Sequence, residues 1–286
     1  MAPAAFPVNV RFALTNRPEN VRLVRELLAG VGSAVQLSEI TLDDAMIAVS
    51  EASNNAVLHA YGGEEGPLEV EFGVADDRFE VRCRDYGFGI APDIRPVPGA
   101  AEGFGLSAIR AFTDAAEIST PAGAGTMVRM TFSAPGMLGL AAAEDELLDA
   151  ALELELDPRT GTSVAIAPAV LANPILTRLA TAVGARAGFT IDRLSDIQLM
   201  IDALTASGAP YLTPAGVVAT LVSDTRRVEL RIGPISPRGL EALSGGPSYS
   251  SLGLIMATLT DHFELLPCLH LQMLSLVLTE RRPSAG

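Results

Sequence analysis

Three polar side chains stand four residues apart in a segment that is expected to be helical. Glu51, Asn55 and His59 fall within DDAMIAVSEASNNAVLHAY, so all three would project along one stripe of the helix. A carboxamide oxygen such as that of Asn55 is a neutral ligand suited to Mg²⁺. A carboxylate one turn away could accept a proton from a hydroxyl or water that attacks phosphorus. The spacing alone fits equally a polar stripe that faces solvent.

Two glycine-rich stretches add further candidates. DYGFGI places Asp85 at the end of an expected strand, with Gly87 and Gly89 allowing a tight turn close to a ligand. A buried carboxylate there could accept a hydrogen bond from an amino group on a flat base. EGFGLSAIRAF places Gly103 and Gly105 just before a helix, where backbone N–H groups attract phosphate. Either stretch alone is weak evidence, but their order along the chain is informative.

The surrounding pattern predicts the elements that must position these residues. Alternation predicts strands over 8–14, 68–74, 78–85 and 126–132. Helical spacing predicts helices over 18–28, from Leu42 to about Tyr61, and over 106–114, with Gly62 and Gly63 ending the second. The core face of the second helix would carry Met46, Val49, Ala52 and Ala56.

Composition excludes several function classes. The chain has 286 residues, a formal charge of −14 and no lysine, so all 20 basic residues are arginines. Walker-type P-loops, eukaryotic-type kinases and Schiff-base enzymes need a lysine, and strong acidity argues against direct nucleic-acid binding. The start lacks the pattern of a signal peptide and no apolar run is long enough to span a membrane. We therefore expect a cytoplasmic protein, with Cys83 and Cys268 as buried thiols rather than a disulfide or metal site.

The charge is unevenly distributed and predicts two domains. Residues 1–137 carry 18 acidic residues and 10 arginines, 138–158 carry 7 acidic residues and no arginine, and 159–286 carry 9 and 10. We therefore predict a first domain over 1–137, an acidic linker over 138–158 and a second domain over 159–286. The pattern of the linker leaves open whether it is helical or extended.

EASNNAVLHAY, DYGFGI, GFGL and GTM, in this order within the first domain, resemble the N-box, the two glycine boxes and the terminal Gly-Thr of the GHKL (Bergerat-fold) ATPases. The N-box form and the short segment between the glycine boxes are most similar to the anti-sigma factor serine/threonine kinases (RsbW/SpoIIAB-like). The resemblance covers about residues 7–135. It implies an α+β fold in which helices pack on one face of a mixed, largely antiparallel sheet.

The resemblance also implies roles for individual residues. Asn55 would coordinate Mg²⁺, and Glu51 would be the general base for transfer of phosphate from ATP to a serine. Asp85 would recognise the adenine amino group with support from Thr126. The remaining glycine-box positions would shape the pocket floor, the lid hinge and the phosphate-facing helix start: Gly87, Gly89, Gly103, Phe104, Gly105 and Leu106. The lid, from about Pro92 to Glu102, departs most from the family because Arg95 is its single cation.

The implied function is that of an ATP- and Mg²⁺-binding anti-sigma regulator. It would phosphorylate a STAS-type anti-anti-sigma protein and, when free of that protein, sequester a sigma factor. One alternative is a partner-switching module that binds ATP but scarcely transfers phosphate. The scarcity of cations in the lid favours this alternative. Another is the ATP-binding half of a histidine-kinase-like system, although none of the three histidines lies in a helical hairpin upstream of the ATP-binding region.

The second domain reads as a degenerate copy of the first. LSDIQLMIDAL (194–204) aligns with LDDAMIAVSEA (42–52), and TRRVELRIGPI (225–235) aligns with DDRFEVRCRDYGFGI (76–90). Ala203 then replaces Glu51, Ser207 replaces Asn55 and Pro234 replaces Asp85. We expect no nucleotide site there, and two alternatives remain open: a structural partner that makes the chain an intramolecular pseudo-dimer, or a separately folded partner-binding domain.

Overall fold

A computed structural model describes residues 7–75, 77–89, 104–120, 125–137, 161–205, 211–244, 251–268 and 271–280. The chain divides into two compact units, Met1–Ala142 and Ala143–Gly286. The whole predicted lid, from Pro92 to Glu102 and including Arg95, lies outside the described residues, as do Gly103, Ser207 and the acidic linker 138–158. Within the described part of the chain, no helix has the length and apolarity needed to cross a membrane.

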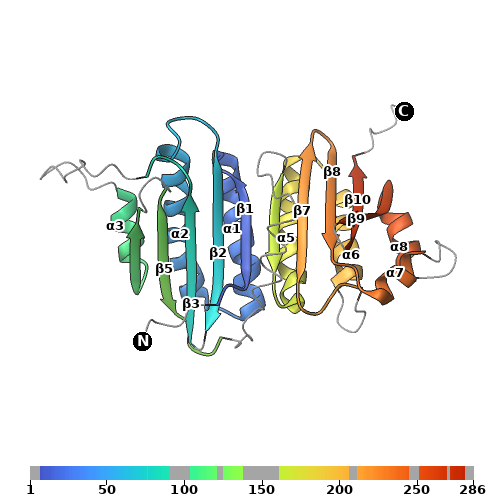
Figure 1. Cartoon of the computed structure of the whole chain (residues 1–286), viewed down its shortest axis with the longest axis horizontal. Helices are drawn as coiled ribbons and strands as arrows, with labels where there is room; N and C mark the ends of the chain where they lie inside the picture. The colour runs from blue at the N-terminus through green and yellow to red at the C-terminus, as the bar shows by residue number, and fades with distance from the viewer. Residues whose placement is uncertain are drawn as a thin grey trace, which may run out of the picture. The chain divides into compact units, whose positions relative to one another are not determined.

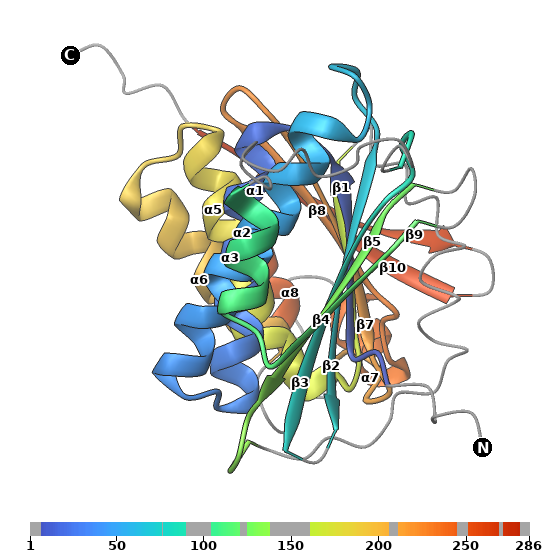
Figure 2. The ribbon, with the colours of Figure 1, turned by 90° about the vertical axis from the view of Figure 1, so that its left-hand side faces the viewer.

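The first unit is an antiparallel sheet with helices on one face, as the sequence predicted. Its elements are β1 (Val10–Thr15), α1 (Pro18–Val35), α2 (Glu39–His59), β2 (Pro67–Ala75), β3 (Arg78–Asp85), α3 (Phe104–Ala111), β4 (Ala115–Ser119) and β5 (Met127–Ser133). The strands lie in the order β1-β2-β3-β5-β4, and every neighbouring pair is antiparallel. Figure 1 shows these strands side by side, and Figure 2 shows α1, α2 and α3 together on one face of them.

Helix α2 is the element that carries the candidate site, and its ends are well defined. It begins at Glu39, three residues earlier than the predicted Leu42, because the Ser38 side chain caps it by accepting the N–H of Thr41 at 3.1 Å. Its buried face consists of small residues, which lets the helix approach the sheet closely: Ala45, Ala48, Val49, Ala52, Ser53 and Ala56. It ends before Gly62 and Gly63, both of which have positive φ.

Core and surface of the sheet separate by the two-residue period of the strands. Phe12, Phe72, Phe79 and Phe132 are fully or almost fully buried, and the rings of Phe72 and Phe79 stack at 6.1 Å. On the other sheet face, one cross-strand row pairs charges, with Arg11 and Arg82 both contacting Glu71 at 2.8 and 3.4 Å. These arginines therefore lie across the sheet from α2.

The second unit repeats this order of elements, with a 3-10 turn added before its first helix and a helix added before its last one. It contains β6 (Thr162–Ile166), a short 3-10 turn (Ala169–Leu171), α5 (Ala172–Arg186), α6 (Ile191–Thr205), β7 (Val217–Asp224), β8 (Arg227–Gly233), α7 (Pro237–Ser244), α8 (Ser251–Leu259), β9 (His262–Cys268) and β10 (Leu271–Thr279). Its strands lie in the order β6-β7-β8-β10-β9, which is the order of the first unit. Mixed α and β structure is thereby confirmed for the chain, while the proposed duplication stays a prediction that this shared order supports.

Candidate functional site

The C-terminal half of α2 brings two of the predicted residues together with the start of α3. Glu51 and Asn55 are half-buried, whereas His59 at the end of the helix is exposed. Gly105, in the first turn of α3, lies against both: a Cβ atom at this position would stand 3.0 Å from Glu51 Oε2 and 3.2 Å from both Asn55 Oδ1 and Asn55 Nδ2. The carboxylate and the carboxamide thus face the N-terminus of a helix, where backbone N–H groups favour anions.

Asp85 forms the second part of the site, at the end of β3. It is only 7% exposed. Its Oδ1 accepts the N–H of Gly87 at 3.0 Å and the N–H of Thr126 at 3.1 Å, and these two bonds fix the direction of the carboxylate. Among the described residues both bonds end on one oxygen, so Oδ2 is placed to accept from a ligand amine. Thr126 itself is half-buried, and its backbone carbonyl also accepts the N–H of Asp85 at 3.0 Å.

Glycines around Asp85 are required because backbones approach one another there. A Cβ at Gly87 would stand 1.9 Å from the carbonyl oxygen of Ala60, and a Cβ at Gly125 would stand 2.0 Å from that of Asp85. Gly89 has φ +72° and Gly125 has φ +77°, a region that other residues rarely adopt. The first glycine box and the Gly-Thr turn therefore pack the backbone around the carboxylate.

Tyr61 is a structural residue of the site that the sequence reasoning missed. Its hydroxyl donates to the carbonyl of Pro67 at 2.6 Å and accepts the N–H of Tyr86 at 2.8 Å. Burial raises the pKa of Tyr61, so the hydroxyl stays protonated and able to donate. The residue thereby joins the end of α2, the start of β2 and the turn after Asp85. Its place two residues after His59, at the end of the N-box, was the available signal.

Beneath the site, Cys83 lies in the core of the sheet. It is a free thiol, 3% exposed, and burial raises its pKa from 9.0 to about 12. The predicted buried thiol at this position is therefore confirmed. Nothing about Cys83 fits a nucleophile or metal ligand.

The donor set suits a cation that takes few protein ligands. Among the described residues, no group of three or more His, Cys, Asp and Glu side chains converges as a metal cage. Mg²⁺ keeps several waters and binds through one or two protein oxygens plus substrate phosphates. One carboxamide beside one carboxylate, at a helix N-terminus that can hold phosphate, fits that chemistry. Leu106 lies half-buried in the same first turn of α3, next to Phe104 and Gly105.

Comparison with known proteins agrees with this geometry. Residues 14–132 match the histidine kinase-like ATPase domain. The serine-protein kinase RsbW of Bacillus velezensis is 43% identical over 79 residues, which is 27% of this chain and 49% of that protein. The corresponding RsbW of Listeria innocua is 42% identical over 79 residues, covering 27% of this chain and 50% of that protein.

These matches are partial. The chain spans about half the length of the curated relatives it matches. A solved structure, crystal form III of TP0453, aligns over 95% of this chain and 90% of that one with 8% identity and a TM-score of 0.37, a similarity too low to support an argument. The resemblance of the first unit to GHKL-type ATPase domains and to the RsbW kinases is confirmed.

Proposed function

Because residues 14–132 carry a histidine kinase-like ATPase domain that resembles the RsbW serine-protein kinases, we propose that this chain binds Mg²⁺ and ATP and phosphorylates a serine or threonine of a STAS-type anti-anti-sigma protein. When free of that protein, it sequesters a sigma factor. The observation that carries the proposal is the convergence of Glu51, Asn55 and Gly105, because this arrangement joins a base, a metal ligand and a phosphate-binding helix end.

In this proposal the Asp85 carboxylate accepts a hydrogen bond from the exocyclic amine of adenine. The carboxylate is buried, and its two backbone donors fix its direction. Thr126 supports the same end of the base, while Gly87 and Gly89 form the floor of the pocket. The α3 N-terminus, with Gly105 and Leu106, faces the phosphates. Gly103 and the side chain of Phe104 lie outside the described part, so their roles rest on the family resemblance.

Asn55 would hold Mg²⁺, which neutralises phosphate charge when it is bound. Glu51 accepts the proton of the attacking hydroxyl. The hydroxyl oxygen then forms a bond to the γ-phosphorus, while the bond from that phosphorus to the bridging oxygen breaks and ADP leaves. Glu51 is one turn from Asn55 on the same helix, so the base would lie on the same side of the site as the residue that would hold the metal.

The second unit is proposed to lack nucleotide binding. Ala203 lies on α6 at the position aligned with Glu51, and Pro234 follows β8 at the position aligned with Asp85. Neither side chain can act as a base or accept from adenine. Where the first unit leads from β3 to α3 through the glycine boxes, the second places helix α7. The pseudo-dimer role of this unit stays a prediction.

Two measurements test the proposal. ATP binding by calorimetry should depend on Mg²⁺ in the wild type and lose that dependence in Asn55→Ala. Incubation with labelled ATP and a candidate STAS protein should give transfer that disappears in Glu51→Gln while ATP still binds. Glu39→Gln, an exposed carboxylate in the first turn of α2, is the matched control.

The outcomes separate the proposal from its alternative. Absence of Mg²⁺-dependent binding would overturn the site itself. Binding without any transfer by the wild type would overturn the kinase and leave the ATP-binding switch, in which nucleotide only fixes the conformation that grips a partner.

A further inference from the structure

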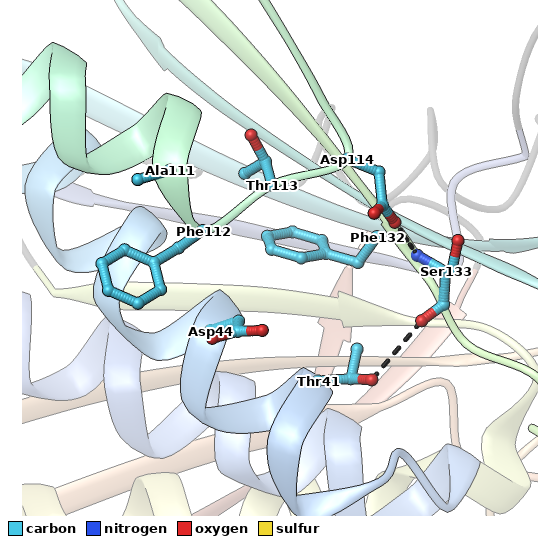
Figure 3. A pocket seen from close by; sticks show the side chains of 8 residues that line it. All are labelled: Thr41, Asp44, Ala111, Phe112, Thr113, Asp114, Phe132 and Ser133. Atoms are coloured by element: carbon cyan, nitrogen blue, oxygen red, sulfur yellow. Dashed lines mark hydrogen bonds between the residues drawn. The ribbon is translucent and has the colours of Figure 1, made fainter.

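An open hollow lies at the start of α2, away from the nucleotide site. It has a volume of about 180 Å³ and is lined by Thr41 and Asp44 of α2, by Ala111 at the end of α3 and Phe112 to Asp114 after it, and by Phe132 and Ser133 of β5. Asp44 precedes Asn55 by eleven residues on the same helix, which corresponds to about 16 Å along its axis. Figure 3 shows Thr41 and Asp44 facing the segment from Phe112 to Asp114 across the hollow.

The second unit has an equivalent site, here called the corner, where the segment after its α8 helix meets the last strand and the start of α6, and it is held by the same hydrogen bonds. Thr113 Oγ1 donates to the carbonyl of Ile109 at 2.8 Å, and Thr260 Oγ1 donates to that of Met256 at 2.7 Å. In each unit the next residue is an aspartate whose carboxylate accepts the N–H of the last strand residue. The two pairs are Asp114 with Ser133 and Asp261 with Thr279.

The facing helices also start in the same way. The N–H of Leu42 bonds to Ser38 O at 2.9 Å, and the N–H of Leu194 bonds to Thr190 O at 2.9 Å. When Leu42 is aligned with Leu194, Asp44 of the first unit is equivalent to Asp196 of the second. This alignment also places Thr41 of the first unit where Arg193 stands in the second.

In the second unit, Arg193 fills the corner. Its Nη1 donates to Asp196 Oδ2 and to the carbonyl of Leu259, both at 2.9 Å, and its Nε donates to the carbonyl of Thr279 at 3.1 Å. Its Nη2 donates to Asp261 Oδ2. The Arg193 side chain is only 12% exposed. The corner is therefore a complete guanidinium-binding site that the unit fills with its own residue.

In the first unit the described residues keep the acceptors of this site, and none of them places a guanidinium in it. The Thr41 hydroxyl donates to the equivalent carbonyl, that of Ser133, at 3.4 Å, but its side chain is too short to fill the hollow as Arg193 fills the corner. The two carboxylates, Asp44 and Asp114, both line the hollow. None of the eight described residues that line it is basic. Two carboxylates directed at one space attract a cation, and planar donors suit the spread of acceptors better than a point charge.

We propose that this hollow binds an arginine side chain of a partner protein, in the way the second unit binds Arg193. A protein partner is favoured over a small guanidine because apolar side chains flank the hollow. Ile40 is 76% exposed and Ile47 is 37% exposed, and they lie along the helix on either side of Asp44. Phe112, which lines the hollow, is 36% exposed. These exposed apolar side chains would pack against the residues of the partner that neighbour the inserted arginine.

The test uses the whole chain, labelled for NMR, and titrates it with N-acetyl-arginine N-methylamide. Saturable shifts are expected at the amides of Thr113, Asp114 and Ser133, with a response at least about tenfold weaker for the lysine analogue. Asp44→Asn should weaken arginine binding by about tenfold, since it removes one of two charged acceptors. Asp43→Asn, on an exposed neighbour outside the hollow, removes the same charge and should leave binding unchanged.

A second variant protects the test against simple misfolding. Thr41→Arg should supply the guanidinium internally, as Arg193 does, so the melting temperature should rise while the response to the arginine probe disappears. Shifts in the wild type that do not saturate, or that persist in both Asp44→Asn and Thr41→Arg, overturn the proposal. A leucine-arginine-leucine peptide should bind more tightly than the single-residue probe, and Ile47→Ser should remove that gain. Equal binding of both probes would overturn the protein partner.

Discussion

Gly105→Ala should separate the stability of the first unit from the function of its nucleotide site. The new Cβ would stand 3.0 Å from Glu51 Oε2 and 3.2 Å from two side-chain atoms of Asn55, so these groups must move by a few tenths of an ångström. Both are ends of flexible side chains and Gly105 is helical, so the fold loses little. Alanine in place of glycine should raise the free energy of unfolding by up to about 1 kcal/mol.

The same displacement should weaken the site. Misplacement by 1 Å costs roughly a hundredfold in rate, so a shift of a few tenths of an ångström should cost on the order of tenfold in phosphate transfer and in Mg²⁺-dependent ATP affinity, or about 1.4 kcal/mol each. Calorimetric titration with ATP, with and without Mg²⁺, measures the affinity, and urea unfolding measures the stability.

Gly87→Ala provides the contrast, because its Cβ would stand 1.9 Å from the backbone oxygen of Ala60, which cannot yield by a side-chain rotation. It should lower stability and ATP binding together. The reasoning fails if Gly105→Ala binds Mg²⁺ and ATP as the wild type does, or if it loses binding only together with its fold.

Four further changes have definite expected results. Burial raises the pKa of Cys83 to about 12, so its contribution to stability is intact below about pH 9 and should fall by up to about 1.4 kcal/mol per pH unit above it. In urea unfolding, the free energy of unfolding of Cys83→Ala should therefore fall less steeply with rising pH than that of the wild type. Equal pH dependence of the two proteins would contradict the burial argument. Tyr61→Phe removes both hydrogen bonds of the hydroxyl and should lower the free energy of unfolding by about 1 to 3 kcal/mol. It should also weaken ATP binding, because the turn after Asp85 loses its bond to Tyr61. Unchanged ATP affinity would show that this turn does not need the Tyr61 hydroxyl. Arg193→Ala should destabilise the second unit by about 2 to 3 kcal/mol in urea without altering ATP affinity. Burial opposes ionisation of Asp261, but hydrogen bonds from Thr279 and the charge of Arg193 lower its pKa overall; its stabilising effect is therefore present above its unfolded pKa and lost as the pH falls, and the acid-unfolding curve of Asp261→Asn should flatten.

The sequence was most informative where one element carries the whole pattern. Glu51 and Asn55 are one turn apart on α2, and Asp85 ends β3 as predicted, because helix and strand periods fix these positions locally. The start of α2 was placed late because the capping role of Ser38 was not considered. Charge counting predicted domains over 1–137 and 159–286 joined by an acidic linker over 138–158. The boundary between the two compact units lies between Ala142 and Ala143, and the predicted domain limits stay a prediction.

Relations across elements were harder to foresee. That Gly105 touches Glu51 and Asn55 depends on how α3 packs on α2, which no local spacing encodes. The two hydrogen bonds of Tyr61 join residues 6 and 25 positions away. The corner that Arg193 fills could not be predicted from the sequence, because Arg193 contacts Asp261, which is 68 residues away. In each case the tertiary packing decides the contact.

The hydroxyl of Tyr61 couples the end of α2 mechanically to the turn that follows Asp85. The amides of Tyr86 and Phe88 are tied to this helix end, through Tyr61 Oη at 2.8 Å and Ala60 O at 2.8 Å. Fraying of the last turn of α2 therefore frees both amides at once, and their hydrogen exchange reports on one shared opening. A ligand held by Asp85 would close that opening, so occupancy of the site can be followed as slowed exchange at two neighbouring amides.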